Sequence, residues 1–209
     1  MKELPILMNG EMVRAILDGK KTQTRRPWIK PKRHENYDVY PVLYSSGFEL
    51  ASNGFCIGEI IKSPFGAPGD RLWVRETWAT DYLHDGIKPS ELTEMDSDIF
   101  YRADGHIDAK TDIWVHCWRP SIHMPRWASR ITLEITREWA ERVQEISEDD
   151  AKAEGLAVSY DPAYLHRYDL TFRGGFTALW DSIYAAKGFG WNTNCWVWGC
   201  EFKVLEGAK

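Results

Sequence analysis

The 209-residue sequence predicts an α+β fold, a small mixed β-barrel with flanking helices. Short apolar runs typical of strands recur along the chain, and only three segments carry a helical pattern. These helices do not alternate with the strands, as they would in a doubly wound sheet. The chain is 44% hydrophobic and 27% charged, which is ordinary for a globular protein, and its length favours a single domain over residues 1–209.

The first predicted elements are a strand, a helix and a second strand. Residues 5–8 form a short apolar run, and residues 11–18 carry apolar side chains at helical spacing. Gly19 is well placed to end this helix, because glycine enters the left-handed region without a steric penalty. Residues 22–26 alternate β-branched and polar side chains and are predicted to be extended, and Pro27 is expected to end them.

Two weakly patterned stretches are predicted to be peripheral insertions. Residues 28–66 are rich in turn residues, and we expect one or two short strands there, such as Gly54–Lys62. A Pro-Gly-Asp corner then precedes a central strand at Leu72–Val74. The second predicted insertion covers residues 79–113.

The second half of the chain predicts further strands and two helices. Ser147 is followed by three acidic residues, a typical helix start, and Gly155 is expected to end this helix. A second helix is predicted at residues 175–186, where apolar side chains share one face. Strands are predicted at 99–102, 114–118, 131–136 and 195–205.

A basic segment contrasts with the charge of the whole chain. Residues 20–33 carry seven cations, although the net charge of the protein is -5. Such a segment favours phosphate-bearing ligands, but a solvated surface loop explains it equally well. The acidic balance argues against tight, nonspecific binding to long nucleic acids.

The composition indicates which other kinds of site and which location to expect. Most of the eleven tryptophans are expected in the core, and one or two could be stacking platforms for bases. The four cysteines show no CxxC spacing and the six histidines are dispersed, so we expect no metal site, no cofactor and reduced thiols. We expect a cytoplasmic protein without a signal peptide, since no apolar run approaches the ~20 residues of a membrane helix.

Three residues are candidates for catalysis. Thr24 could be a nucleophile only beside a base, and Lys21 is the nearest candidate. Residues three apart on a regular strand point to opposite faces, so the two can converge only if Lys21 belongs to the preceding turn. Glu154 faces the negative end of its helix dipole, which disfavours the ionised form by ~0.3–1 kcal/mol. It is either an exposed, harmless side chain or a carboxyl that shuttles protons.

Several motifs along the chain occur together in one known family. Residues 16–25 read Ile-Leu-Asp-Gly-Lys-Lys-Thr-Gln-Thr-Arg, and they resemble the N-terminal signature of ASCH domains, which are members of the PUA-like superfamily. The Pro-Gly-Asp-Arg-Leu-Trp-Val segment, the helix from Ser147 and the closing strand are similar to later family elements. The resemblance covers about half of the chain. Together with Ser-Ile-His-Met-Pro-Arg-Trp-Ala-Ser-Arg at residues 121–130, it is strongest to the larger ASCH-like proteins of bacteriophages and prophages.

The resemblance implies a PUA-like barrel and a ligand that is RNA or a modified nucleoside. Small bacterial ASCH enzymes remove the acetyl group from the exocyclic amine of 4-acetylcytidine with a Lys, a Thr and a Glu, which match Lys21, Thr24 and Glu154. The implied activity is therefore a cofactor-free amidohydrolase. The alternatives are a non-catalytic binder of RNA or modified DNA, a ribonuclease, and a phage accessory protein that acts through protein contacts.

Further residues are predicted to contact the substrate or nucleic acid. The cations would bind phosphate or stabilise an oxyanion, and the tryptophans would stack on a base. These residues are Lys20, Arg25, Arg26, Trp73, Arg75, Arg126, Trp127 and Arg130.

Overall fold

The computed structural model describes residues 1–31, 34, 39–44, 47–93, 98–105, 115, 117–156 and 171–205. The chain divides into two compact units. The first unit comprises Met1–Gly19, Gly69–Glu134 and Lys203–Lys209, and the second comprises Lys20–Pro68 and Ile135–Phe202. Strands and α-helices are segregated along the chain, so the predicted α+β class is confirmed.

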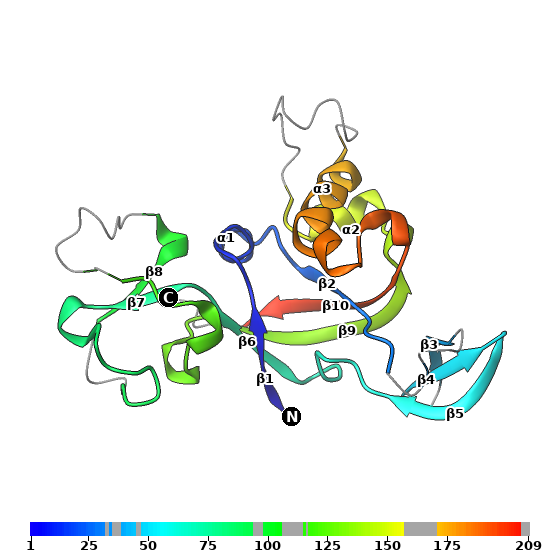
Figure 1. Cartoon of the computed structure of the whole chain (residues 1–209), viewed down its shortest axis with the longest axis horizontal. Helices are drawn as coiled ribbons and strands as arrows, with labels where there is room; N and C mark the ends of the chain where they lie inside the picture. The colour runs from blue at the N-terminus through cyan, green and yellow to red at the C-terminus, as the bar shows by residue number, and fades with distance from the viewer. Residues whose placement is uncertain are drawn as a thin grey trace. The chain divides into compact units, whose positions relative to one another are not determined.

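The first unit is built on a mixed sheet. Its strands, in spatial order, are β1 (Glu3–Leu7), β6 (Arg71–Arg75) and the beginning of β9 (Thr132–Arg142). β1 runs parallel to β6, whereas β6 and β9 are antiparallel (Figure 1). These strands have an apolar sequence pattern because they contribute buried side chains to the core, namely Ile6, Leu72, Val74 and Leu133.

The predicted N-terminal helix is confirmed as α1 (Gly10–Leu17). Its first turn is capped by the Asn9 side chain, which accepts a hydrogen bond from the Met12 amide. Met12, Val13 and Ile16 are buried on one face. Gly19 has φ +69°, so it ends the helix in the left-handed conformation that its position predicted.

A small two-stranded sheet completes the described part of the first unit. β7 (Trp78–Thr80) pairs antiparallel with β8 (Ile99–Tyr101), so the strand predicted at 99–102 is confirmed. The strand predicted at 114–118 lies partly outside the described residues. Val115, Cys117 and Trp118, which are described, belong to no strand.

The second unit contains the remaining core strands and two helices. β9 continues beside β10 (Trp196–Val204), which pairs antiparallel with β2 (Gln23–Pro27). Figure 1 shows α2 (Glu148–Ala153) and α3 (Phe172–Tyr184) close to these strands. An apolar cluster joins them, including Ala151 of α2, Phe176 and Trp180 of α3, and Val197 of β10. Both predicted helices and the closing strand are thereby confirmed.

Two strand predictions were incomplete, since one strand is longer than predicted and one segment holds more strands than predicted. The strand predicted at 131–136 continues to Arg142. The prediction ended too early because residues 138–142 are all half-buried, and they therefore lack the alternation of buried and exposed side chains on which it relied. The segment 28–66 holds three strands, β3 (Val39–Tyr44), β4 (Gly47–Ser52) and β5 (Phe55–Ile61), paired in that order. Asn53-Gly54, both with positive φ, forms the β4–β5 turn and is the hairpin signal that the prediction overlooked.

Candidate functional site

The candidate site lies in the second unit, where the chain preceding β2 meets the end of α2. Lys21 forms an isolated antiparallel bridge with Glu154 and is not part of β2. The adjacent Thr22 amide donates to the Ala153 carbonyl at 2.8 Å. Ser147 caps α2, and Gly155, at φ +85°, follows its last turn. The main chain thus fixes Glu154 beside Lys21.

Lys21 and Glu154 form a buried ion pair. Lys21 Nζ lies 2.6 Å from Glu154 Oε2 and also donates to the Glu154 carbonyl oxygen at 2.9 Å. The two residues are only 1% and 6% exposed. Removing two charges from water costs several kcal/mol per ion, and their attraction often does no more than offset that cost. A buried pair of this kind is a candidate for function as much as for stability.

Arg25 approaches Glu154 from β2. Its Nη1 donates to Glu154 Oε1 at 3.2 Å, and its Nε donates to Glu141 Oε1 at 2.6 Å. Its Nη2 lies 3.7 Å from Asp150 Oδ2. Arg25 was predicted to bind a phosphate or an oxyanion, yet it is 2% exposed. Its guanidinium therefore faces the protein's own carboxylates.

Burial and neighbouring charges set the state of the Lys21 amine. Burial lowers the pKa of Lys21, Glu154 raises it, and the positive charges of Arg26 and Arg25 lower it, so that the pKa lies below the ordinary lysine value. A lysine with a lowered pKa loses its proton more readily and can act as a general base.

Thr24 is the least satisfied polar group of the predicted trio. Its side chain is fully buried, and among the described residues Thr24 Oγ1 has no hydrogen-bond partner. Because neighbours on a strand alternate, Thr24 faces away from the side of β2 that carries Arg25. The structure therefore brings Lys21 and Glu154 together, whereas Thr24 Oγ1 bonds to neither. An unpaired buried hydroxyl costs ~1–3 kcal/mol and calls for a functional explanation.

Cys200 is paired in register with Thr24 on the neighbouring strand β10. Burial raises the pKa of its thiol to about 12. The thiol is therefore protonated at neutral pH and is a poor nucleophile.

Lys20 and Arg26 flank these residues in the sequence. Lys20 is exposed, and Arg26 is half-buried with Nη1 donating to the Arg25 carbonyl at 3.2 Å. Their positions are compatible with contacts to a ligand.

Trp73 and two predicted cationic contacts lie together in the first unit. Trp73 is 9% exposed, and the guanidinium carbons of Arg75 and Arg126 lie 4.9 and 5.9 Å from its ring centre. Arg75 also donates to the Met124 carbonyl, and Arg126 pairs with Glu3 at 3.1 Å. Little of the Trp73 ring is left for stacking on a base.

Trp127 and Arg130 are also held by contacts within the first unit. Trp127 packs edge-on against Trp78, with ring centres 6.3 Å apart. Arg130 pairs with Glu76 at 3.0 Å and with Asp104 at 2.7 Å. Both residues therefore have partners within their own unit, and their contact with a ligand stays a prediction.

The sequence prediction missed Trp139, Glu141 and Asp150. Trp139 lies against the Arg25 guanidinium, with 5.2 Å between the guanidinium carbon and the ring centre. Trp139 and Glu141 are two apart on β9 and so share one face, but that part of the strand was not predicted. A longer strand assignment would have placed both on the strand that lies next to β10.

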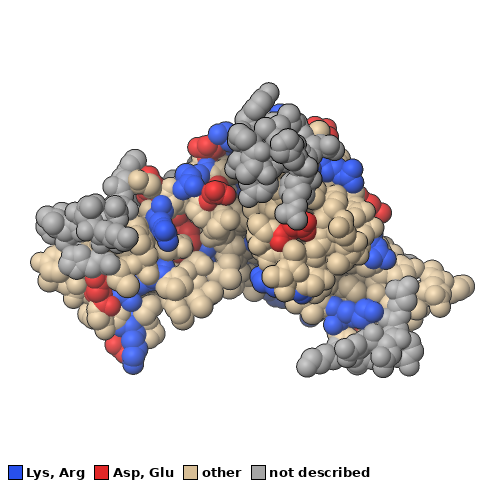
Figure 2. All heavy atoms as spheres, turned by 45° about the horizontal axis from the view of Figure 1, so that its top comes forward, with Lys and Arg blue, Asp and Glu red and all other residues tan. Residues whose placement is uncertain are grey.

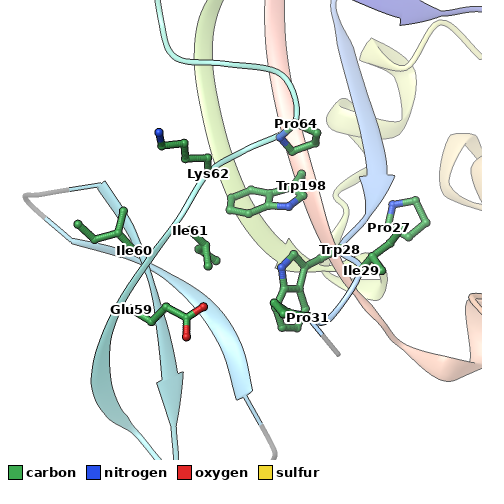
Figure 3. Close-up of a pocket in the computed structure, with 10 residues that line it drawn as sticks. All are labelled: Pro27, Trp28, Ile29, Pro31, Glu59, Ile60, Ile61, Lys62, Pro64 and Trp198. Atoms are coloured by element: carbon green, nitrogen blue, oxygen red, sulfur yellow. The ribbon is translucent and has the colours of Figure 1, made fainter. Parts of the chain in front are cut away.

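Two surface features bear on ligand binding, namely the distribution of positive charge and one groove. Figure 2 shows Lys and Arg side chains dispersed among other residues on the face in view, without one continuous basic patch. A groove of about 400 Å³ lies between the end of β2 and β5 (Figure 3). It is lined by Pro27, Trp28, Ile29, Pro31, Glu59, Ile60, Ile61, Lys62, Pro64 and Trp198.

The described residues contain neither a cluster of metal ligands nor a helix that could span a membrane. Over that part of the chain, no three His, Cys, Asp or Glu side chains cluster closely enough to hold a metal ion. None of the helices in the described ranges is both long and apolar enough to cross a membrane.

Comparison with known proteins gave structural similarities only. No protein-family model matches the sequence, and no curated protein matches it. An ASCH domain from Lactobacillus crispatus JV V101 is 11% identical, with a TM-score of 0.40 over 97% of this chain and 79% of that chain. A protein from Enterococcus faecalis V583, described as DUF984, is 9% identical, with a TM-score of 0.42 over 98% of this chain and 77% of that chain. Similarities of this size do not establish a shared family or activity.

Proposed function

We propose that this chain is an ASCH-type, PUA-like protein of phage or prophage origin that acts on nucleosides or nucleic acids. Its proposed reaction is hydrolysis of an acyl amide on the exocyclic amine of a modified cytidine, such as 4-acetylcytidine. The observation that supports it most directly is the buried Lys21–Glu154 pair, at 2.6 Å, with a lysine whose pKa is lowered by burial. A base and a proton carrier are thus in direct contact.

Each proton of the proposed reaction moves between named atoms. Neutral Lys21 takes the Thr24 hydroxyl proton while Oγ1 attacks the acyl carbonyl carbon. The carbon–nitrogen bond breaks, and that proton passes from Lys21 through Glu154 to the leaving amine. Water then attacks the threonine ester, its proton returns through Glu154 and Lys21 to Thr24 Oγ1, and the carboxylic acid leaves.

This reaction requires Thr24 Oγ1 to approach Lys21 once the substrate is bound. Because Thr24 faces away from the side of β2 that carries Arg25, the main chain at the start of β2 must turn for this contact to form. Catalytic hydrogen bonds often form only in the substrate complex, so the unpaired Oγ1 is compatible with the proposal. The fully buried hydroxyl is already free of competing bonds among the described residues.

Simple binding of RNA receives less support from the same residues. Five of the six predicted cationic contacts belong to the binding alternative as phosphate contacts: Lys20, Arg25, Arg26, Arg126 and Arg130. Arg25, Arg126 and Arg130 form ion pairs with carboxylates inside their own units. Phosphate contacts supply most of the nonspecific affinity for nucleic acids. Because three of the five cations are engaged by carboxylates of the protein, the binding alternative is weaker.

The test is hydrolysis of 4-acetylcytidine by the purified protein, followed by chromatography. We expect cytidine and acetate from the wild type, loss of product in Lys21→Met and Thr24→Ala, and partial activity in Thr24→Ser. Arg142→Gln is the matched control, because the Arg142 guanidinium packs over Trp196 and donates to the Asn194 carbonyl, and within the described structure it bonds none of Lys21, Thr24 and Glu154.

Two outcomes would change the proposal. Full activity of Thr24→Ala would exclude the threonine nucleophile and leave Lys21 and Glu154 to activate water directly. No turnover by the folded wild-type protein would reject the amidohydrolase. Salt-dependent binding of RNA by that inactive protein would instead support the binding alternative.

A further inference from the structure

Arg25 is buried among the carboxylates of Glu141, Asp150 and Glu154, and the proposed reaction gives Arg25 itself no step. We propose that Arg25 is a positioning residue that holds Glu154 by Oε1 and thereby keeps Oε2 directed at Lys21. This inference rests on the proposed function, since it assigns a role within the same site. It replaces the predicted role of Arg25 as a contact to substrate.

The geometry divides the two oxygens of Glu154 between two cations. Lys21 Nζ bonds Oε2 at 2.6 Å, and Arg25 Nη1 bonds Oε1 at 3.2 Å. A carboxylate held at both oxygens cannot rotate about its terminal bond without breaking one of these contacts. The rigid guanidinium fork suits this task better than the flexible amine of a lysine.

Arg25 is itself held by hydrogen bonds at Nε and Nη1, whereas Nη2 has an ion-pair partner but no hydrogen bond within the described residues. Nε bonds Glu141 Oε1 at 2.6 Å, and Nη1 also donates to Gln23 Oε1 at 3.1 Å. Nη2 lies 3.7 Å from Asp150 Oδ2. These partners come from β9, β2 and α2. The guanidinium therefore joins these three elements to Glu154, which directly follows α2.

Trp139 covers the same guanidinium from β9. The Arg25 guanidinium carbon is 5.2 Å from the Trp139 ring centre. The indole also lies so close to Gly199 that a Cβ at that position would overlap it. Gly199 and Arg25 are register partners on β10 and β2, so the glycine provides the space in which Trp139 reaches Arg25.

The charge of Arg25 acts on Lys21 as well as on Glu154. Burial is the largest influence on the pKa of Lys21 and lowers it. Among the charged groups, Glu154 raises this pKa, and Arg26 and Arg25 lower it. Glu141 and Asp150 lie against Arg25 and reduce its effect. Removing the Arg25 charge should therefore make Lys21 hold its proton more tightly.

The first test is the pH profile of 4-acetylcytidine hydrolysis by Arg25→Gln. We expect kcat to fall about 10- to 100-fold, KM to change little, and the rising limb of the profile to move to higher pH. Arg25→Lys should restore the position of the limb, because it restores a charge, while kcat stays low because the fork is missing. Arg142→Gln should match the wild type in all three quantities.

Arg25→Gln leaves three carboxylates near a single amine and could fail to fold. The double variant Arg25→Gln/Glu141→Gln removes one opposing charge and provides a second measurement on a better balanced cluster. We expect it to show the same displaced limb as the single variant. A wild-type profile in either folded variant, or a change in KM alone, would overturn the inference.

A second readout does not depend on activity. Nitrogen-15 NMR of the Lys21 side chain, assigned with Lys21→Met, reports the protonation of the amine in the free protein. We expect the amine to titrate at higher pH in Arg25→Gln than in the wild type, and an unchanged titration would overturn the role of Arg25. If the wild type does not hydrolyse 4-acetylcytidine, the proposed reaction fails, while this titration still decides the inference about Arg25.

Discussion

Lys21 and Glu154 are 133 positions apart in the sequence, yet their side chains meet at 2.6 Å in a buried ion pair. The contact is reinforced by main-chain pairing, since the same two residues form a β-bridge and the Thr22 amide bonds the Ala153 carbonyl. The end of α2 and the chain preceding β2 are thereby joined. A single tertiary contact thus fixes both members of the proposed acid–base pair.

Breaking this pair on one side should strongly destabilise the protein. Lys21→Met leaves Glu154 buried without its closest cation, and the expected loss in the free energy of unfolding is ~3–5 kcal/mol. Lys21→Met/Glu154→Gln removes both charges of the pair and should regain part of that loss. Denaturant unfolding of the two variants measures the difference. A loss below ~1 kcal/mol for the single variant, the range of an exposed ion pair, would contradict the buried arrangement.

Gly199→Ala should destabilise the second unit through a steric clash. A Cβ at position 199 would overlap the Trp139 indole, so the ring must move away from Arg25. Overpacking of this kind costs ~1–3 kcal/mol. Thermal unfolding of Gly199→Ala, Trp139→Leu and the double variant measures the coupling. We expect the double variant to lose less stability than the sum of the singles, and strict additivity would show that the two residues do not touch.

The cap of α2 should matter because this short helix carries Glu154. The Ser147 hydroxyl accepts a hydrogen bond from the Asp150 amide at 3.1 Å, so Ser147→Ala should cost ~1 kcal/mol in the free energy of unfolding. Amide hydrogen exchange should accelerate in α2. Ser182→Ala is the matched control, since Ser182 lies inside α3 and bonds only the Leu179 carbonyl in the described structure. Equal effects of the two substitutions would argue against the cap.

Tyr101 should make stability fall at alkaline pH. Burial raises the pKa of Tyr101 to about 12, against the ordinary value of 10.0, and the Arg130 charge only partly opposes this. Between pH 10 and pH 12 the unfolded chain loses the phenolic proton while the native protein keeps it. The free energy of unfolding therefore falls as the pH rises through this window.

Tyrosinate absorbance during an alkaline titration measures this effect. A late step near pH 12 should lose the amplitude of one of the nine tyrosines in Tyr101→Phe. The stability of that variant should also depend less on pH in the same window. A late step of unchanged amplitude would assign it to another tyrosine.

Local sequence patterns predicted much of the fold because their causes are local. The amphipathic spacing before Gly19 predicted α1, and Ser147 with its acidic neighbours predicted α2. The apolar run at β6 predicted a central strand and the run at β10 predicted a closing strand, and most residues of both are buried. The patterns failed where burial depends on distant partners, as in residues 137–142 of β9, whose mixed polarity conceals a strand.

The sequence by itself determined the α+β class and singled out Lys21, Thr24 and Glu154. It could not decide which of them meet, because the direction of a side chain depends on whether Lys21 is in the strand or before it. Only the tertiary structure decided that Lys21 and Glu154 pair, and that Arg25 is buried between Glu154 and Glu141. The physical reason is that a buried charge is stable only beside an opposite charge, and the fold brings such partners together from distant positions. Spacing along the chain therefore does not predict which charges will pair.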